Sequence, residues 1–329
     1  MILAGDVGGT KTVLALFEDG VGTLEKVVEA TYRSPDHGSL DDLVHQFCAM
    51  HGRGGLHAAC FGVPGPVIDG ACRTTNLPWV IDESVLRTAL KVPQVRLLND
   101  LQAAAYGMLF LPEEDFFILN AGRTLDRRRN MAVIAAGTGL GEAMLVWDGE
   151  KHIPVASEGG HASFSPRDDQ EVELLGFLMQ RLGGKGAHVS WERAVAGPAL
   201  HSLYGFLKSR GGRESPSVQE RLVREDPGSV IGLEAVNGTD ALCEETVQFF
   251  CRLYGSEAGN LALKCVATGG VFIGGGIAPK ILPVLQKSGF MEAFVDKGRY
   301  RSLLEGMPVL VAKNDRAPLI GAARYAARL

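Results

Sequence analysis

The sequence lacks long apolar runs and an excess of basic residues, and each absence excludes a class of protein. No stretch reaches the ~18 apolar residues of a membrane-spanning helix; residues 131–147 come closest, but they include Thr138, Glu142 and three glycines. No charged segment followed by an apolar one marks a secretory signal. The 33 Lys and Arg residues face 38 Asp and Glu, a net charge of −5. A nucleic-acid partner needs a basic face, so we expect none.

Cysteine is also scarce, and its spacing carries no motif. The six cysteines are scattered without a C-x-x-C pair, whereas a zinc site needs clustered ligands. We therefore expect buried thiols, no zinc and a cytoplasmic location. The chain of 329 residues, 46% of them hydrophobic, has room for two domains of ordinary size.

The segment at residues 5–12, Gly-Asp-Val-Gly-Gly-Thr-Lys-Thr, lies between strand-like runs at 2–7 and 12–17. Two strands joined by adjacent glycines form a hairpin with bare backbone N–H groups, which suit a phosphate when a hydroxyl and a cation are near. A carboxylate in a buried strand is costly unless it meets a cation or water, which suggests Mg²⁺. The residues predicted to hold phosphate and Mg²⁺ are Asp6, Gly8, Gly9, Thr10 and Lys11.

The segment at residues 5–12 also has two other interpretations. It nearly fits the P-loop pattern, but Thr10 stands where that pattern has glycine, and a strand follows where a P-loop needs a helix. A plain hairpin without a ligand is the other.

Strands and helices alternate along most of the chain, which predicts an α/β fold. A strand–glycine turn–strand element occurs near residue 8 and again near residue 139, which indicates two related halves facing each other. We predict strands at 24–31, 56–63, 95–98, 116–120, 131–136, 142–147, 271–273 and 309–312. One helix is predicted to begin at Ser39, and a long one to be capped by Thr239 and to end near Cys265. Further helices are predicted at 83–90, 101–111, 170–181, 191–208, 277–286 and 317–328.

The second glycine turn, Gly137-Thr138-Gly139-Leu140-Gly141, is flanked by strands. A dinucleotide fingerprint has other spacing and a following helix, so a second phosphate-binding hairpin is the better interpretation. Gly274-Gly275-Gly276 precedes a predicted helix, whose N-terminus would attract an anion and whose glycines would admit a nucleotide; a plain strand-to-helix turn is the alternative.

Five polar residues follow predicted strands or open helices. Asn99-Asp100 ends a strand and starts a helix, where α/β folds usually bind ligands; Asp100 could take a proton from a hydroxyl, or be an N-cap. Glu158 and His161 flank two glycines and suit sugar hydroxyls, or are surface residues. Glu192 is either a further hydroxyl ligand or a first-turn acid that favours the helix dipole.

These motifs, in this order and together with His188-Val189-Ser190-Trp191-Glu192, resemble bacterial glucokinase over nearly the whole chain. The resemblance implies an α/β fold of two ribonuclease-H-like (actin-like ATPase) domains flanking a cleft. We predict that residues 1–110 and 315–329 form the small domain and 111–314 the large one.

The resemblance also implies the role of each residue. Asp100 would be the catalytic base for the 6-hydroxyl of glucose, and Asn99, Glu158, His161 and Glu192 would bind the other hydroxyls. The phosphates of ATP would lie on Gly8, Gly9, Thr10, Gly137, Thr138 and Gly139, the adenosine near Gly275 and Gly276, and Mg²⁺ at Asp6 through water. A homodimer is expected because the family is commonly dimeric.

Several alternatives stay open on the sequence. A related repressor–kinase sugar family carries a zinc-binding cysteine cluster soon after the histidine of its Glu-x-Gly-His turn, but no cysteine lies between Cys72 and Cys243 here. Its regulators begin with a DNA-binding domain, which we do not expect in this chain. A sugar-binding regulator without turnover, a chaperone- or filament-like ATPase, and a kinase for another hexose are the rivals. Polyphosphate or ADP could replace ATP as donor.

Overall fold

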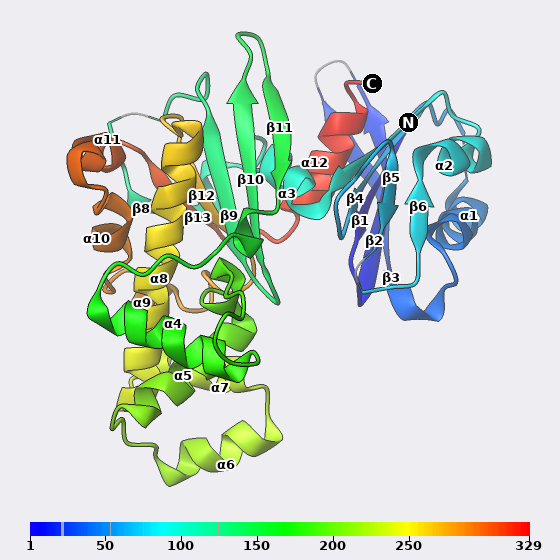
Figure 1. The fold of residues 1–329 in the computed structure, drawn as a ribbon. Helices are drawn as coiled ribbons and strands as arrows, with labels where there is room; N and C mark the ends of the chain where they lie inside the picture. Colours follow the sequence, from blue (N-terminus) through cyan, green and yellow to red (C-terminus); the bar gives the residue numbers. More distant parts are fainter. Residues whose placement is uncertain (21–22, 53, 75, 124) are drawn as a thin grey trace.

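The computed structural model describes residues 1–20, 23–52, 54–74, 76–123 and 125–329. Two mixed sheets stand side by side, with helices between and around them (Figure 1). The first sheet has the order β3-β2-β1-β4-β7, and its strands are β1 (Ile2–Val7), β2 (Lys11–Asp19), β3 (Leu24–Arg33), β4 (Ala58–Val63) and β7 (Gln94–Asn99). Strand β4, which lies between β1 and β7 and runs parallel to both, is buried along its whole length, as expected for a parallel strand covered on both faces.

The second sheet has the order β11-β10-β9-β12-β13-β8. Its strands are β8 (Phe116–Asn120), β9 (Met131–Ala136), β10 (Leu140–Trp147), β11 (His152–Ser157), β12 (Val271–Gly274) and β13 (Val309–Ala312). Strands β9 and β10 pair antiparallel, as β1 and β2 do in the first sheet. The predicted pair of glycine hairpins and the two related α/β halves are therefore confirmed. A small hairpin, β5 (Ala71–Arg73) with β6 (Val80–Asp82), completes the strands in the described residues.

Helices α3 (Asp100–Met108) and α12 (Ala317–Ala326) lie between the two sheets (Figure 1). Ala103 of α3 and Leu319 of α12 pack in the apolar cluster of the first sheet, whereas Ala105 and Ala317 pack in that of the second sheet. Each helix therefore contributes to both cores, and the start of α3 is held rigidly at the junction.

Glycine lets these two helices approach closely. A Cβ atom at Gly107 would collide with the backbone carbonyl of Ala317, and one at Gly321 would collide with the carbonyl of Ala103. Close packing of this kind leaves no room for an added methyl group.

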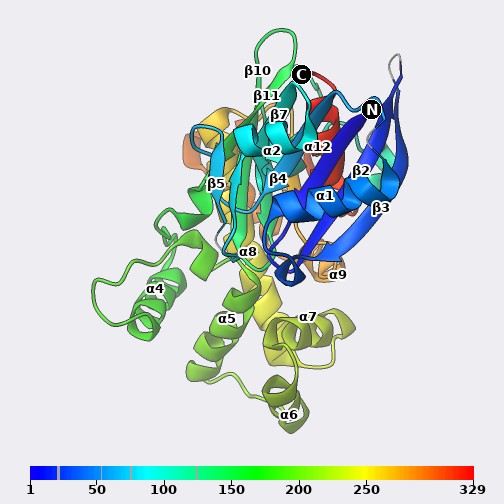
Figure 2. The same ribbon diagram turned by 90° about the vertical axis from the view of Figure 1, so that its right-hand side faces the viewer.

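The outer face of the first sheet is covered by α1 (Leu40–His51) and α2 (Glu83–Leu90), which lie in front of it in Figure 2. Ser39 caps α1 as predicted, because its hydroxyl accepts a hydrogen bond from the N–H of Asp42. The apolar side of α1 is buried against this sheet. The predicted bounds of α2 are confirmed.

Helix α8 (Ala241–Cys265) packs on the second sheet, and the other helices of this half gather around it. Those that contact α8 are α5 (Gly197–Ser209), α7 (Pro227–Asn237), α9 (Leu282–Leu285), α10 (Phe290–Val295) and α11 (Arg301–Glu305), while α4 (Asp169–Arg181) packs on α5 and α6 (Pro216–Arg224) packs on α7. Tyr254 of α8 is fully buried and donates a hydrogen bond to the carbonyl of Ile134 (3.2 Å), which ties this helix to β9.

Three helix predictions are wrong in part. The helix predicted at 191–208 is a short 3₁₀ turn, Trp191–Arg193, followed by α5, because Gly197 and Pro198 favour a helix start rather than an interior. Asp240, not Thr239, caps α8, and its carboxylate accepts from the N–H of Cys243. The helix predicted at 277–286 is reduced to α9, because a series of turns follows the glycine triplet.

All six cysteine side chains are buried as thiols. Among the described residues, no helix is both long and apolar enough to cross a membrane. The same part of the chain holds no group of three or more His, Cys, Asp or Glu side chains suited to a metal ion.

Candidate active site

The first glycine hairpin joins β1 to β2, and its turn is held by a residue that the sequence did not single out. Gly8 donates a hydrogen bond to the carbonyl of Lys11 (2.9 Å). Ser34 donates from its hydroxyl to the carbonyl of Gly8 (2.7 Å) and from its N–H to the carbonyl of Thr10 (3.0 Å). The turn is therefore braced from outside, and its other backbone groups are left for a ligand.

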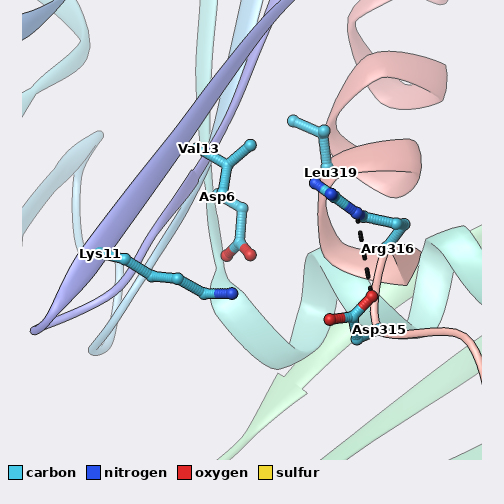
Figure 3. Close-up of a pocket in the computed structure, with 6 residues that line it drawn as sticks. All are labelled: Asp6, Lys11, Val13, Asp315, Arg316 and Leu319. Atoms are coloured by element: carbon cyan, nitrogen blue, oxygen red, sulfur yellow. Dashed lines mark ion pairs between the residues drawn. The ribbon is translucent and has the colours of Figure 1, made fainter. Parts of the chain in front are cut away.

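Asp6 of β1 lies at the base of this hairpin and lines a small pocket with Lys11, Val13, Asp315, Arg316 and Leu319 (Figure 3). Burial raises the pKa of Asp6 to about 6, the negative charge of Asp100 adds to the rise, and Lys11 opposes it. Asp315 and Arg316, which pair with each other (3.8 Å), act on the Asp6 carboxyl in opposite directions: Asp315 raises its pKa and Arg316 lowers it.

Asn99 and Asp100 occupy the junction of β7 and α3. Asn99, not Asp100, is the N-cap: its side-chain oxygen accepts from the N–H of Leu101 (3.0 Å), and its amide donates to the carbonyl of Gly65 (3.2 Å). Asp100 is the first residue of α3 and accepts from the same N–H of Leu101 (2.7 Å). The N-cap interpretation of Asp100 is therefore wrong.

The surroundings of Asp100 perturb its acidity. Burial raises the pKa of Asp100, a hydrogen bond from the Leu101 N–H opposes this, and the negative charge of Glu158 raises it further. Asp100 thus interacts with Asp6 of the first hairpin and with Glu158 of the second sheet.

Glu158 and His161 lie on the turn after β11. Their side chains are more than half exposed, and Glu158 Oε2 lies 4.0 Å from His161 Nε2. A Cβ atom at Gly160 would collide with the carbonyl of Leu140, so this turn is pressed against the second glycine hairpin. Only glycine fits such an approach.

Glu192 contacts the same hairpin. Its Oε2 accepts a hydrogen bond from the N–H of Leu140 (3.1 Å), and the N–H of Trp191 binds the carbonyl of Ala162 (2.9 Å). The second hairpin, the 158–161 turn and Glu192 therefore form one continuous structure.

The second hairpin is open at Gly137, whereas the Glu192 carboxylate covers Gly139. No described atom lies within 4 Å of the place where a Cβ atom of Gly137 would be. The carbonyl of Gly137 accepts a hydrogen bond from the N–H of Gly197 (2.8 Å). The helix that begins beside this turn is thus α5.

The glycine triplet lies against Ala136, the last residue of β9 before the second hairpin turn. Gly275 has φ +80°, and a Cβ atom there would collide with the carbonyl of Ala136. Gly275 and Gly276 are exposed. The expected helix N-terminus is missing directly after the triplet, so a ligand there would meet exposed glycine backbone instead.

Known proteins match this chain over its whole length. A family model described as glucokinase matches residues 3–329. The glucokinase of Trichormus variabilis is 41% identical over 344 residues, covering 100% of this chain and 99% of the relative. The crystal structure of a glucokinase from an Antarctic psychrotroph superimposes with a TM-score of 0.86 at 32% identity, covering 100% of this chain and 99% of the other.

A more distant structure shares only the fold. A ROK family glucokinase from Streptomyces griseus, solved with glucose and AMPPNP, has a TM-score of 0.66 at 21% identity and covers 100% of this chain and 99% of its own.

Proposed function

The chain belongs to the glucokinase family and is an ATP-dependent hexose kinase, and we propose that Asp100 is the base that activates the 6-hydroxyl of glucose. The observation that carries this proposal is the electrostatic coupling of the half-buried Asp100 carboxyl both to Asp6 of the first hairpin and to Glu158 of the second sheet. A base in that position can meet a sugar held near Glu158 and a phosphate held near Asp6.

The raised pKa of Asp100 favours this role, because a carboxylate becomes a better proton acceptor as its pKa approaches the working pH. Asp100 takes the hydroxyl proton while the sugar oxygen attacks the γ-phosphorus in line. The new phosphorus–oxygen bond forms as the bond to the bridging oxygen breaks, and ADP leaves with its electron pair.

The chemistry of the residues around Asp6 fits Mg²⁺. Mg²⁺ prefers one or two carboxylates together with water and substrate phosphates, and Asp6 offers one carboxylate beside the open backbone of the first hairpin. When bound, the ion would neutralise negative charge on the transferring phosphate. Asp6 would orient it through water, while Gly8, Gly9, Thr10 and Lys11 bind the phosphates.

The second hairpin and the glycine triplet complete the proposed nucleotide site. Gly137, Thr138 and Gly139 would hold the phosphates, and the exposed backbone of Gly275 and Gly276 would lie against the adenosine. The two hairpins and the glycine triplet would thus bind one nucleotide between them.

The proposed sugar ligands are Asn99, Glu158, His161 and Glu192. Glu158 and Glu192 are carboxylates that accept hydrogen bonds from hydroxyls. They would repel an acidic sugar, because like charges would then meet in a partly desolvated site. A neutral hexose is therefore the expected acceptor.

We further propose that residues 1–110 and 315–329 move as one body relative to 111–314 when the sugar binds, since closure would keep water from the γ-phosphate. The packing of α12 on the first sheet supports this division. Small-angle scattering with and without glucose tests it, and identical curves would argue against closure. The homodimer stays a prediction, which sedimentation analysis can check.

Asp100→Asn tests the role of the base. The variant keeps the side-chain shape, so we expect a folded protein with kcat lowered at least ~10²-fold. A coupled assay of ADP release across several sugars and phosphoryl donors measures this. Near-normal turnover would remove Asp100 from the role, and turnover unaffected by any sugar would contradict the proposed acceptor.

A further inference from the structure

A buried carboxyl group lies directly beneath the proposed sugar-binding turn. Glu142 of β10 is 1% exposed, and a Cβ atom at Gly159 would fall onto its Oε2 atom. Its cross-strand neighbour in β11 is Ser157, whose hydroxyl accepts a hydrogen bond from the N–H of Gly159 (3.0 Å). Glu142 therefore packs against the backbone that carries Glu158 and His161.

The group facing Glu142 is a second carboxyl, that of Glu257 on α8, which is fully buried. Glu257 already accepts hydrogen bonds from the Asn260 amide (2.7 Å) and the Lys264 ammonium (3.2 Å). Its two oxygens thus have the partners of an ionised carboxylate. Lys264 supplies one positive charge to this pair of acids.

Glu142 has no such donors. In the part of the chain that the structure describes, Oε1 of Glu142 is buried and receives no hydrogen bond. Two neighbouring buried carboxyls do not both ionise readily. A proton on Glu142, donated to Glu257, satisfies both groups at once.

The electrostatics agree with this arrangement. Burial raises the pKa of Glu142, the negative charge of Glu257 raises it further, and Lys264 opposes the rise. Helix α8 also presents Tyr254 to Glu142. Beyond Glu257 lie Lys297 and Arg167. Burial lowers the pKa of Lys297, and the positive charge of Arg167 lowers the pKa of Lys297 further. The turn itself carries Glu158 and His161, and the facing strand β9 presents Ile134.

We propose that protonated Glu142 is a positioning residue for the hexose: it supports Gly159 from below, and its ionisation displaces the turn that carries Glu158 and His161. The inference rests on the proposed function, which assigns those two side chains to the sugar. A second negative charge beside Glu257 would draw water into the pair and push the carboxyls apart. Because Glu142 Oε2 lies close against Gly159, a movement of the Glu142 side chain would be passed to the turn.

The sign of the pH effect follows from the direction of the shift. Because the folded protein holds the Glu142 proton more tightly than the unfolded chain does, that proton is present at neutral pH and below, and it is lost as the pH rises through the raised pKa. Hexose binding should therefore weaken in the alkaline range.

Calorimetric titration of the full-length protein with glucose, without nucleotide, tests this over a pH series from neutral into the alkaline range. We expect the wild-type dissociation constant to rise on the order of tenfold, the effect of losing one hydrogen bond to a charged group. Glu142→Gln stays neutral and can still donate to Glu257, so its binding should stay flat over the same range. Glu245→Gln, an exposed position on α8, is the matched control and should behave as wild type.

A second variant keeps the test decisive if Glu142→Gln folds poorly. Glu257→Gln removes the negative charge that raises the pKa of Glu142, so the loss of glucose binding should move to lower pH. If Glu142 only supported the turn and did not titrate, the pH midpoint of glucose binding would be the same in Glu257→Gln and wild type. A flat wild-type profile, or a Glu142→Gln profile that still falls, overturns the inference.

Glu158→Gln separates this inference from the proposed function. If it binds glucose normally at neutral pH, the proposed sugar site fails and the inference fails with it. If Glu158→Gln loses glucose binding, and the glucose binding of Glu142→Gln still weakens at alkaline pH as in wild type, only the inference fails.

Discussion

Gln102 of α3 donates a 2.6 Å hydrogen bond from its side-chain amide to the backbone carbonyl of Pro154 in β11. The amide oxygen of the same side chain accepts from the N–H of Asn99 (3.3 Å). One side chain thus joins the start of the helix that carries Asp100 to the strand that leads into Glu158. This link crosses between the two sheets and sets the spacing of the proposed base and the proposed sugar ligands.

Gln102→Leu should lower kcat/KM for glucose roughly tenfold, the equivalent of about one lost hydrogen bond. The matched control is Gln94→Leu, at the far end of β7, which loses a 2.7 Å hydrogen bond to the carbonyl of Leu329. Steady-state kinetics on both variants measure the difference. Equal losses in the two variants would mean that the link to Pro154 plays no special part.

The acid limit of activity should follow Asp6. Its pKa is raised to about 6, chiefly by burial, so protonation below that pH should weaken the hold on Mg²⁺ and raise the KM for ATP. A bound cation favours the ionised carboxylate, and more Mg²⁺ should therefore move the acid limb to lower pH. Profiles of kcat/KM for ATP against pH at two Mg²⁺ concentrations check this. An acid limb at the same pH for both concentrations would contradict the prediction.

Ionised Asp6 should also lower the free energy of unfolding of the ligand-free protein at neutral pH. Its pKa is higher in the folded state than the ordinary 3.8, so its contribution is complete below that value and is lost as the pH rises through about 6. Asp6→Asn should therefore raise the free energy of unfolding at neutral pH while lowering activity. Urea unfolding without ligands measures it, and Asp19→Asn, on β2 of the same sheet, is the control. Destabilisation by Asp6→Asn at neutral pH would contradict the argument.

The crossing of α3 and α12 should tolerate no added methyl group. Gly107→Ala and Gly321→Ala each place a Cβ atom on a backbone carbonyl, and we expect each to lower the free energy of unfolding by ~1–3 kcal/mol. Gly176→Ala in α4 is the control, because no described atom lies within 4 Å of its Cβ position. That variant should be as stable as wild type or more stable by up to ~1 kcal/mol. Unfolding curves that do not separate the two classes would refute the packing argument.

The local pattern of apolar and turn residues in the sequence predicted much of this fold. The strands at 116–120, 131–136 and 309–312 and the helix at 83–90 have the predicted bounds, because period, composition and turn residues act within a few positions. The predicted helices at 191–208 and 277–286 were wrong in part, since an apolar pattern alone does not show where tertiary contacts stop a helix. Ser190, for example, bridges to Ser163, and Ile277 binds the carbonyl of Ala136.

By itself, the sequence determined the two glycine hairpins, the α/β class and the candidate residues at strand ends, because these depend on neighbours along the chain. Only the tertiary structure decided that Ser34 braces the first hairpin, that Gln102 joins the two halves, and that Glu142 meets Glu257. Those contacts unite residues far apart in sequence. The burial and charge that set the acidity of Asp6 and Asp100 arise only when the two sheets close on the helices between them.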